Sequence, residues 1–88
     1  PQLPAQARPF WLLPTPLALQ TAHDRPVYRG GPLRLALGPE RMETGWWSTS
    51  GHERRDYFIA QDQQGAYYWV YRQRETPASG WFLHGLFG

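Results

Sequence analysis

Hydrophobic and polar residues alternate with a period of two most clearly in the last third of the chain. The segments 54–61 and 66–72 each place apolar side chains on both faces of an extended strand, which predicts two strands. Between them, Asp62-Gln63-Gln64-Gly65 is typical of a type I turn followed by a left-handed glycine. A third strand is expected over 81–87, with Trp81, Leu83 and Phe87 on one face and Phe82, His84 and Leu86 on the other. Together these segments predict a three-stranded antiparallel meander.

The first half of the chain has shorter apolar runs that are separated by proline and glycine. Leu33, Leu35 and Leu37 alternate with Arg34 and Ala36, which predicts a strand with the three leucines on one apolar face. Gly38-Pro39 is expected to end this strand. The segment 40–44 alternates again, and 23–29 is expected to form a turn and a short strand. No segment has an apolar stripe of helical period, so the helix content should be low.

A short apolar run over 10–13 is stopped by Pro14 and Pro16. Because proline has no N–H to donate to a sheet, such a run is expected at a sheet edge or in an extended docking segment. Residues 1–9 carry three prolines and no apolar periodicity, so they are predicted to be a linker or tail. Residues 10–88 are predicted to form a single small β domain.

The composition favours the same fold class. The chain has five Trp, five Tyr and four Phe, which together make 16% of its residues, with nine Gly and nine Pro. Aromatic residues favour strands, while glycine and proline favour turns. Strands that are apolar on both faces are not stable in an isolated single layer. We therefore predict an all-β fold: a small antiparallel sheet or partly open barrel of five or six short strands.

The sequence carries no pattern that indicates catalysis. His23 lies beside Asp24 and His52 beside Glu53, and adjacent residues of an extended chain point apart, so these are poor chelating pairs. No metalloprotease, nucleophile-elbow, phosphate-loop or dinucleotide-binding pattern occurs. The chain is therefore expected to be no enzyme and to hold no metal ion or cofactor. Its lack of cysteine suits a reducing cytoplasm, and no apolar run approaches the roughly 18–20 residues that cross a membrane.

The surplus of aromatic residues favours a protein interface. All nine basic residues are arginine, and arginine and aromatic residues are enriched at the centres of protein interfaces. For any single Trp a core position is favoured, whereas the set as a whole is better explained by an interface. The residues expected to contact a partner are Trp46, Trp47, Arg54, Arg55, Tyr68, Arg72, Trp81 and His84.

A single-stranded DNA-binding surface is the alternative interpretation. The segment 67–72, Tyr-Tyr-Trp-Val-Tyr-Arg, combines rings that could stack on bases with an arginine that could bind phosphate. The net charge is only +2, and acidic residues accompany most of the arginines. The charge therefore does not by itself indicate nucleic acid, and the alternative depends on the rings and the arginine of this segment.

Several motifs in the second half of the chain resemble the ImuB proteins. Residues 38–47, GPERMETGWW, are similar to a stretch near the C-terminus of that family, and residues 80–87, GWFLHGLF, are similar to its ending. Residues 55–58 (RDYF) and 69–72 (WVYR) fit between them, and Arg8-Pro9 and residues 11–14 fit upstream. The resemblance covers nearly the whole chain, with the motifs in the family's order.

The resemblance implies a role in bacterial damage-induced mutagenesis, part of the SOS response. ImuB proteins resemble Y-family translesion DNA polymerases without the catalytic carboxylates, and they join other proteins of the system. The chain is then expected to be a C-terminal, non-catalytic domain that recruits the ImuA-type protein, the error-prone C-family DNA polymerase, or both. Gln2-Leu3-Pro4 is not followed by a complete sliding-clamp motif, so no clamp contact is assigned here.

Four polar residues fall within the motifs: Arg41, Arg55, Asp56 and His84. Some of them are expected to form a fixed network between strands. A buried arginine must be paired, and either Asp56 or Glu40 could supply the carboxylate.

Overall fold

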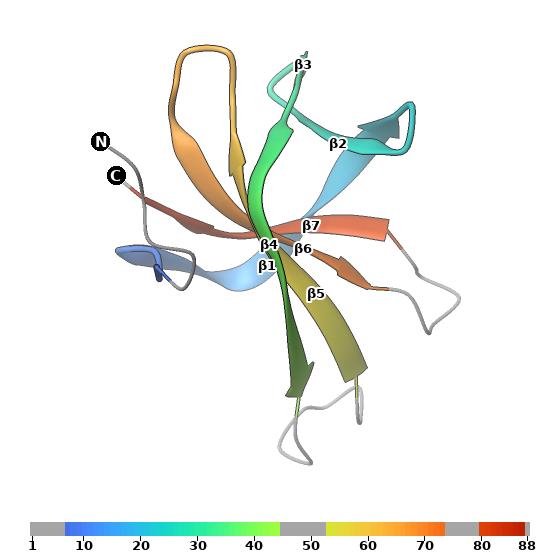
Figure 1. Ribbon diagram of the computed structural model, residues 1–88, viewed down its shortest axis with the longest axis vertical. Coiled ribbons are helices and arrows are strands. Elements are labelled where there is room, and N and C mark those ends of the chain that lie inside the picture. The colour runs from blue at the N-terminus through green and yellow to red at the C-terminus, as the bar shows by residue number, and fades with distance from the viewer. Residues whose placement is uncertain (1–6, 45–52, 74–79, 88) are drawn as a thin grey trace.

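Seven β-strands form one antiparallel sheet (Figure 1). The computed structural model describes residues 7–44, 53–73 and 80–87. The strands are β1 (Trp11–Ala22), β2 (Arg25–Tyr28), β3 (Gly31–Pro32), β4 (Arg34–Thr44), β5 (Glu53–Gln61), β6 (Tyr67–Gln73) and β7 (Gly80–Leu86). Their order across the sheet is β3-β2-β1-β7-β6-β5-β4, and the sheet is curled and open, like half of a barrel. The described residues contain no helix, and hence none that could cross a membrane. The predicted all-β fold is confirmed, with seven strands instead of five or six.

Side chains on both faces of the sheet are buried, in two separate clusters. The Val70 cluster consists of Leu33, Ala60, Tyr68, Val70, Trp81 and Leu83. The Tyr57 cluster consists of Tyr57, Ile59, Trp69 and Tyr71. Because successive side chains of a strand point to opposite faces, β5 and β6 contribute to both clusters. Two cores that share one sheet explain why these strands are apolar on both faces.

The predicted meander is confirmed, since β5, β6 and β7 pair antiparallel in succession. Asp62 organises the β5–β6 turn: its Oδ1 accepts hydrogen bonds from the backbone N–H groups of Gln64 and Ala66, both at 2.9 Å. Gly65 has a φ of +93°, the left-handed conformation expected from the sequence. The Tyr68 hydroxyl donates to Asp62 Oδ2 at 2.8 Å. This hydrogen bond lowers the pKa of Asp62, while burial, followed by the same bond, raises the pKa of Tyr68.

The strand predicted over the three leucines differs from the structure in two respects. Leu33 and Leu35 pack with the Val70 cluster, but Leu37 packs with the Tyr57 cluster on the other face. The pairing of β4 with β5 shifts register between Leu35 and Leu37 and again before Glu40. These irregularities turn the leucines to different faces, and β4 continues through Gly38-Pro39 to Thr44. The predictions of a shared face and of a strand end at Gly38-Pro39 are therefore wrong.

A similar irregularity in β7 changes the faces of its last residues. Trp69 lies opposite Gly85, whereas the next residue of β6, Val70, lies opposite Leu83, so β7 has one extra residue at this point. Leu86 consequently packs with the Val70 cluster, and Phe87 packs with the Tyr57 cluster. The prediction that Phe87 shares a face with Trp81 and Leu83 is wrong, because a period of two does not survive a bulge.

The strand β1 runs through both of its prolines, which was not expected. Its pairing with β7 shifts register between Leu12 and Leu17, and Pro14 and Pro16 lie within that interval. Proline is tolerated there because the interval has no regular sheet ladder. The strand β2 pairs only with residues 20–22 of β1, so among the described strands residues 11–19 pair with β7 alone. This part of β1 is thus a sheet edge, as one of the two sequence interpretations predicts.

Candidate protein-interaction surface

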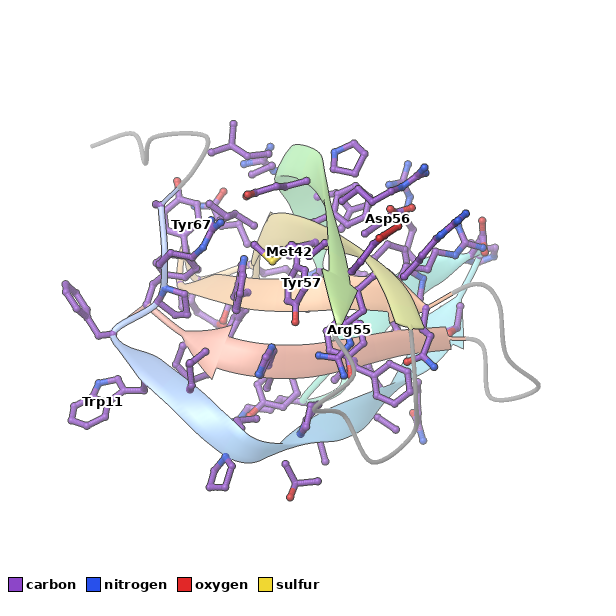
Figure 2. The ribbon with its side chains drawn as sticks, turned by 90° about the horizontal axis from the view of Figure 1, so that it is seen from below. Trp11, Met42, Arg55, Asp56, Tyr57 and Tyr67 are labelled. Atoms are coloured by element: carbon purple, nitrogen blue, oxygen red, sulfur yellow. The ribbon has the colours of Figure 1, made fainter. Side chains whose placement is uncertain are left out.

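The large exposed hydrophobic side chains of the described residues gather at the start of β1. Phe10 is 81% exposed, Trp11 67%, Leu12 59% and Leu17 47%. In Figure 2, Trp11 projects away from the sheet at one extremity of the molecule. We call these four residues the β1 apolar surface. Burying such side chains is favourable, and a cluster of them left in water is typical of a binding site.

The β1 apolar surface extends over both faces of the sheet. Trp11 lies opposite Leu86, and Leu17 lies opposite Leu83, and both of these partners belong to the side of the Val70 cluster. Directly opposed residues of paired strands share a face. Leu12, the neighbour of Trp11, lies opposite Gly85 and therefore points to the other face.

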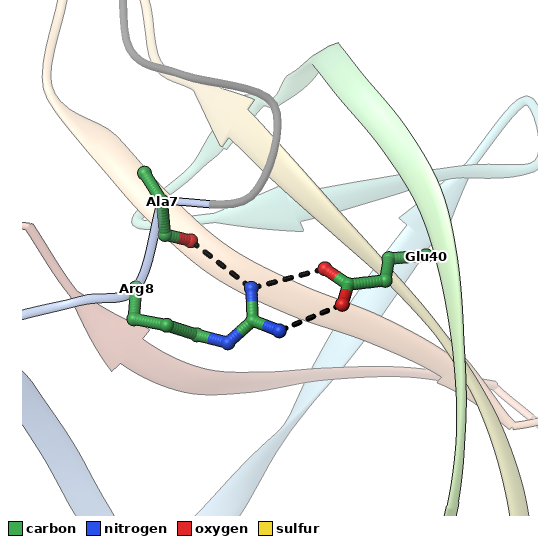
Figure 3. A network of polar contacts seen from close by, with 3 residues as sticks. All are labelled: Ala7, Arg8 and Glu40. Carbon is green, nitrogen blue, oxygen red and sulfur yellow. Dashed lines mark hydrogen bonds and ion pairs between the residues drawn. The ribbon is translucent and has the colours of Figure 1, made fainter.

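Residues 7–9, which form the end of the predicted linker, lie against the sheet just before this surface. The Arg8 guanidinium binds the Glu40 carboxylate of β4 through two hydrogen bonds, of 3.0 and 2.7 Å, and it donates to the Ala7 carbonyl at 3.4 Å (Figure 3). The same guanidinium lies 5.3 Å from the ring centre of Trp69. We call residues 7–9 the N-terminal strap, because they connect the start of β1 with β4 across the Tyr57 cluster.

Gly85 explains how closely the strap approaches β7. A Cβ atom at this position would lie 2.5 Å from Pro9 Cγ and 2.9 Å from the Trp11 carbonyl oxygen. Only glycine allows this approach. The strap and Gly85 together fix the position from which Phe10 and Trp11 project.

The structure places the predicted partner-binding residues in different environments. Trp46 and Trp47 lie outside the described residues. Arg54 forms an exposed ion pair with Glu43 at 3.4 Å, and Arg72 forms one with Asp24 at 3.1 Å. Tyr68 and Trp81 are 9% and 3% exposed and belong to the Val70 cluster. Since a ring buried to this degree offers almost no contact area, neither is included in the surface described above.

The comparisons with known proteins agree with the resemblance in the sequence. No family model and no solved structure matches the chain. The chain is 32% identical to Protein ImuB of Caulobacter vibrioides, in two strains, over 105 aligned positions that cover 97% of the chain. It fits a C-terminal fragment of ImuB. The match spans 23% of the length of these relatives.

The residues that resemble ImuB form the expected network between strands. Arg41 of β4 binds Asp56 of β5 at 3.1 Å, and Asp56 is 6% exposed. Arg55 donates a hydrogen bond of 3.1 Å to the Tyr57 hydroxyl and lies 4.4 Å from the ring centre of Tyr71. Arg55, Asp56 and Tyr57 are consecutive residues of β5 and are labelled in Figure 2. Contacts between strands are present as expected, and Asp56 is the carboxylate for Arg41, but the Arg41 side chain is 66% exposed and is therefore not a buried arginine.

His84 of the ImuB-like ending extends the Arg55–Tyr57 contact to β7. Its Nδ1 lies 2.7 Å from the Tyr57 hydroxyl, and its ring stacks on Trp69 with centroids 5.2 Å apart. Since arginine can only donate, the Tyr57 oxygen accepts from Arg55, which leaves its own hydrogen available to an unprotonated His84 Nδ1. Donation from Tyr57 to Nδ1 is compatible with a neutral imidazole only. Burial and the positive charge of Arg55 both lower the pKa of His84 from its usual value of 6.5.

The lowered pKa of His84 predicts an acid-sensitive fold. As the pH falls below about 6.5, the unfolded chain takes up a proton at this histidine before the folded chain does. The free energy of unfolding should therefore decrease as the pH falls between the unfolded-state and folded-state pKa values. Urea titrations at about pH 7.5 and pH 5 measure this loss, and His84→Gln should make it smaller.

His23→Asn is the matched control for this prediction. His23 is exposed, lies outside the Tyr57 cluster and has a φ of +52°, which asparagine tolerates, so this variant removes an imidazole without changing the contacts of His84. An unchanged pH dependence in His84→Gln would contradict the role assigned to His84.

Sequence reasoning did not include the β1 apolar surface among the partner-binding residues. The signal was present, since an apolar run flanked by prolines was expected to be an edge or a docking segment. The sequence alone does not show which side chains of this run are exposed. Leu13, for example, is half-buried against the Val70 cluster. Among the described residues, no group of three or more His, Asp or Glu side chains could hold a metal ion.

Proposed function

We propose that this chain is a non-catalytic interaction domain of an ImuB protein in bacterial damage-induced mutagenesis. In this role it recruits the ImuA-type protein, the error-prone C-family DNA polymerase, or both. The similarity to ImuB over 97% of the chain supports the system, and the β1 apolar surface supports recruitment. The exposure of Trp11 is the observation that carries the proposal, because a tryptophan left in water is a typical anchor for a partner.

The polar residues of the ImuB-like motifs support a structural role over a catalytic one. Arg41 and Asp56 bind each other, and Tyr57 lies between Arg55 and His84. Each of these groups is held by a neighbour in the sheet. We therefore assign no catalytic, metal or cofactor role to them.

Single-stranded DNA binding has less support than protein recruitment. Base stacking needs exposed rings, but Tyr68, Trp69 and Tyr71 are each at most 9% exposed. Arginine side chains cover two of the buried rings, with Arg8 over Trp69 and Arg55 over Tyr71. A salt titration separates the two functions, since DNA binding should weaken steeply as the salt concentration rises.

The test of recruitment is a titration calorimetry experiment with the purified ImuA-type protein and, separately, the C-family polymerase. We expect at least one of them to bind the chain, and Trp11→Ala to weaken that binding about tenfold or more. Thr15→Ala, an exposed change on the same strand, is the control and should bind like the parent chain. Failure of both proteins to bind would contradict the proposed function.

A further inference from the structure

The β1 apolar surface has a shape that a flat partner surface cannot cover. Trp11 and Leu17 lie on the face of the Val70 cluster, whereas Leu12 lies on the opposite face. All three side chains are exposed, at the free edge of the sheet. A partner that docks against one face would leave the other face in water. Both are buried together only if the partner has a cleft that receives the edge of the sheet.

We infer that β1 inserts its N-terminal half into an apolar cleft of the partner protein. This inference rests on the proposed function and specifies how recruitment takes place. The chain supplies the projecting element, with Trp11 and Leu12 as anchors on its two faces. The partner supplies the cleft. This is the reverse of the arrangement in which a domain of this kind binds a peptide in its own groove.

The charge distribution identifies the cleft as apolar. No Asp, Glu, Lys, Arg or His occurs from residue 9 to residue 22, which includes the whole of β1. The nearest charge before this segment, on Arg8, is already bound by Glu40. A cleft lined with charges would lose their hydration and gain no opposite charge in return. Nucleic acid is disfavoured for the same reason.

The area of the surface argues against a second copy of the chain as the occupant. Taking about 150–250 Å² for a fully exposed aromatic residue and somewhat less for leucine, the four side chains offer roughly 500 Å². A stable interface buries about 800 Å² on each partner. Two copies meeting at this surface would fall short of that area, whereas a cleft also contacts the backbone of the inserted edge.

The prolines argue against a partner that simply adds a strand to β1. Strand addition relies on a continuous series of backbone N–H and C=O groups along the free edge. Pro14 and Pro16 have no N–H, and they lie where the β1–β7 pairing is already irregular. Recognition must therefore come mainly from side chains, which agrees with the exposure of Trp11 and Leu12.

The experiment compares one substitution on each face of the sheet. Trp11→Ser and Leu12→Ser are titrated with the ImuA-type protein and the C-family polymerase, and Ala18→Ser, an exposed change further along β1, is the control. We expect both anchor variants to weaken binding about tenfold or more, and the control to leave it unchanged. The dissociation constant should change less than about threefold between roughly 0.05 and 0.5 M salt, because no charge pair is involved. Thermal melting of each variant verifies that it is folded.

The possible failures can be told apart. If the parent chain binds neither protein, the proposed function fails, and the inference fails with it. If the parent chain binds but only one of the two anchor variants is weakened, docking is one-sided, so the cleft is refuted while recruitment stands. Sedimentation of the chain alone tests whether a second copy covers β1. A dimer that Trp11→Ser dissociates would show that it does, and this result would also overturn the inference.

Discussion

Replacing Trp81 with alanine should cost about 3–5 kcal/mol of the free energy of unfolding. Trp81 is 3% exposed in the Val70 cluster, its ring lies against Phe58 with centroids 5.3 Å apart, and the Arg72 guanidinium lies 5.5 Å from its ring centre. A domain of this size has a total stability of about 4–13 kcal/mol, so the loss would remove between about a quarter and all of that stability. Urea denaturation followed by circular dichroism measures it.

Two variants give this prediction its controls. Trp81→Phe keeps a ring in the cluster and removes an indole N–H that has no hydrogen-bond partner among the described residues, so its cost should be clearly smaller. Trp11→Ala removes the same type of side chain from a position that is 67% exposed, and it should leave stability nearly unchanged. Equal losses for Trp81→Ala and Trp11→Ala would contradict the division into core and surface.

The second large effect is expected at Gly38, where Gly38→Ala should cost more than about 2 kcal/mol. Gly38 has a φ of +117°, which side-chain-bearing residues rarely adopt. A Cβ atom there would also lie 2.7 Å from the Tyr57 carbonyl oxygen and 3.0 Å from Phe58 Cδ2. Alanine would therefore push β4 away from β5 at the point where their register shifts. Chemical denaturation measures the loss.

Gly65→Ala is the matched control, because it changes the same residue type at a similarly positive φ. At Gly65, with a φ of +93°, the nearest atom to an added Cβ is Gln61 Nε2 at 3.8 Å, which is an ordinary contact. Gly65→Ala should therefore lower the free energy of unfolding only by the cost of placing alanine at a positive φ, on the order of 1 kcal/mol. If Gly38→Ala and Gly65→Ala lowered the free energy of unfolding equally, the close approach of Gly38 to β5 would not contribute to the cost.

The sequence predicts this fold best where strands are regular and turns are local. The β5–β6 hairpin could be derived residue by residue, because the Asp62 side chain and Gly65 determine the turn chemically. The irregularities of β4 and β7 could not be derived. A β-bulge depends on how two strands pair. The sequence of one strand does not show at which residue its pairing with the neighbouring strand shifts register.

The sequence also does not show which aromatic residues form the candidate site. The sequence indicates that a domain this rich in aromatic residues exposes some of them, and the structure agrees at Phe10 and Trp11. Which rings are exposed depends on distant contacts. Trp81 is covered by side chains of the Val70 cluster that come from several strands, whereas Trp11 lies at a free edge with no described strand beyond it. Residue type is identical in the two cases, so composition cannot distinguish them.

The Val70 and Tyr57 clusters share one sheet, and this arrangement should make the unfolding of the protein cooperative. In β6, Val70 belongs to one cluster and Trp69 to the other, and β5 divides its side chains in the same way. Neither face can lose its packing without disturbing the backbone pairing that supports the opposite face. The domain should therefore unfold as a single cooperative unit, with the slowest native-state hydrogen exchange in the amides of β5, β6 and β7, which each have a paired strand on both sides.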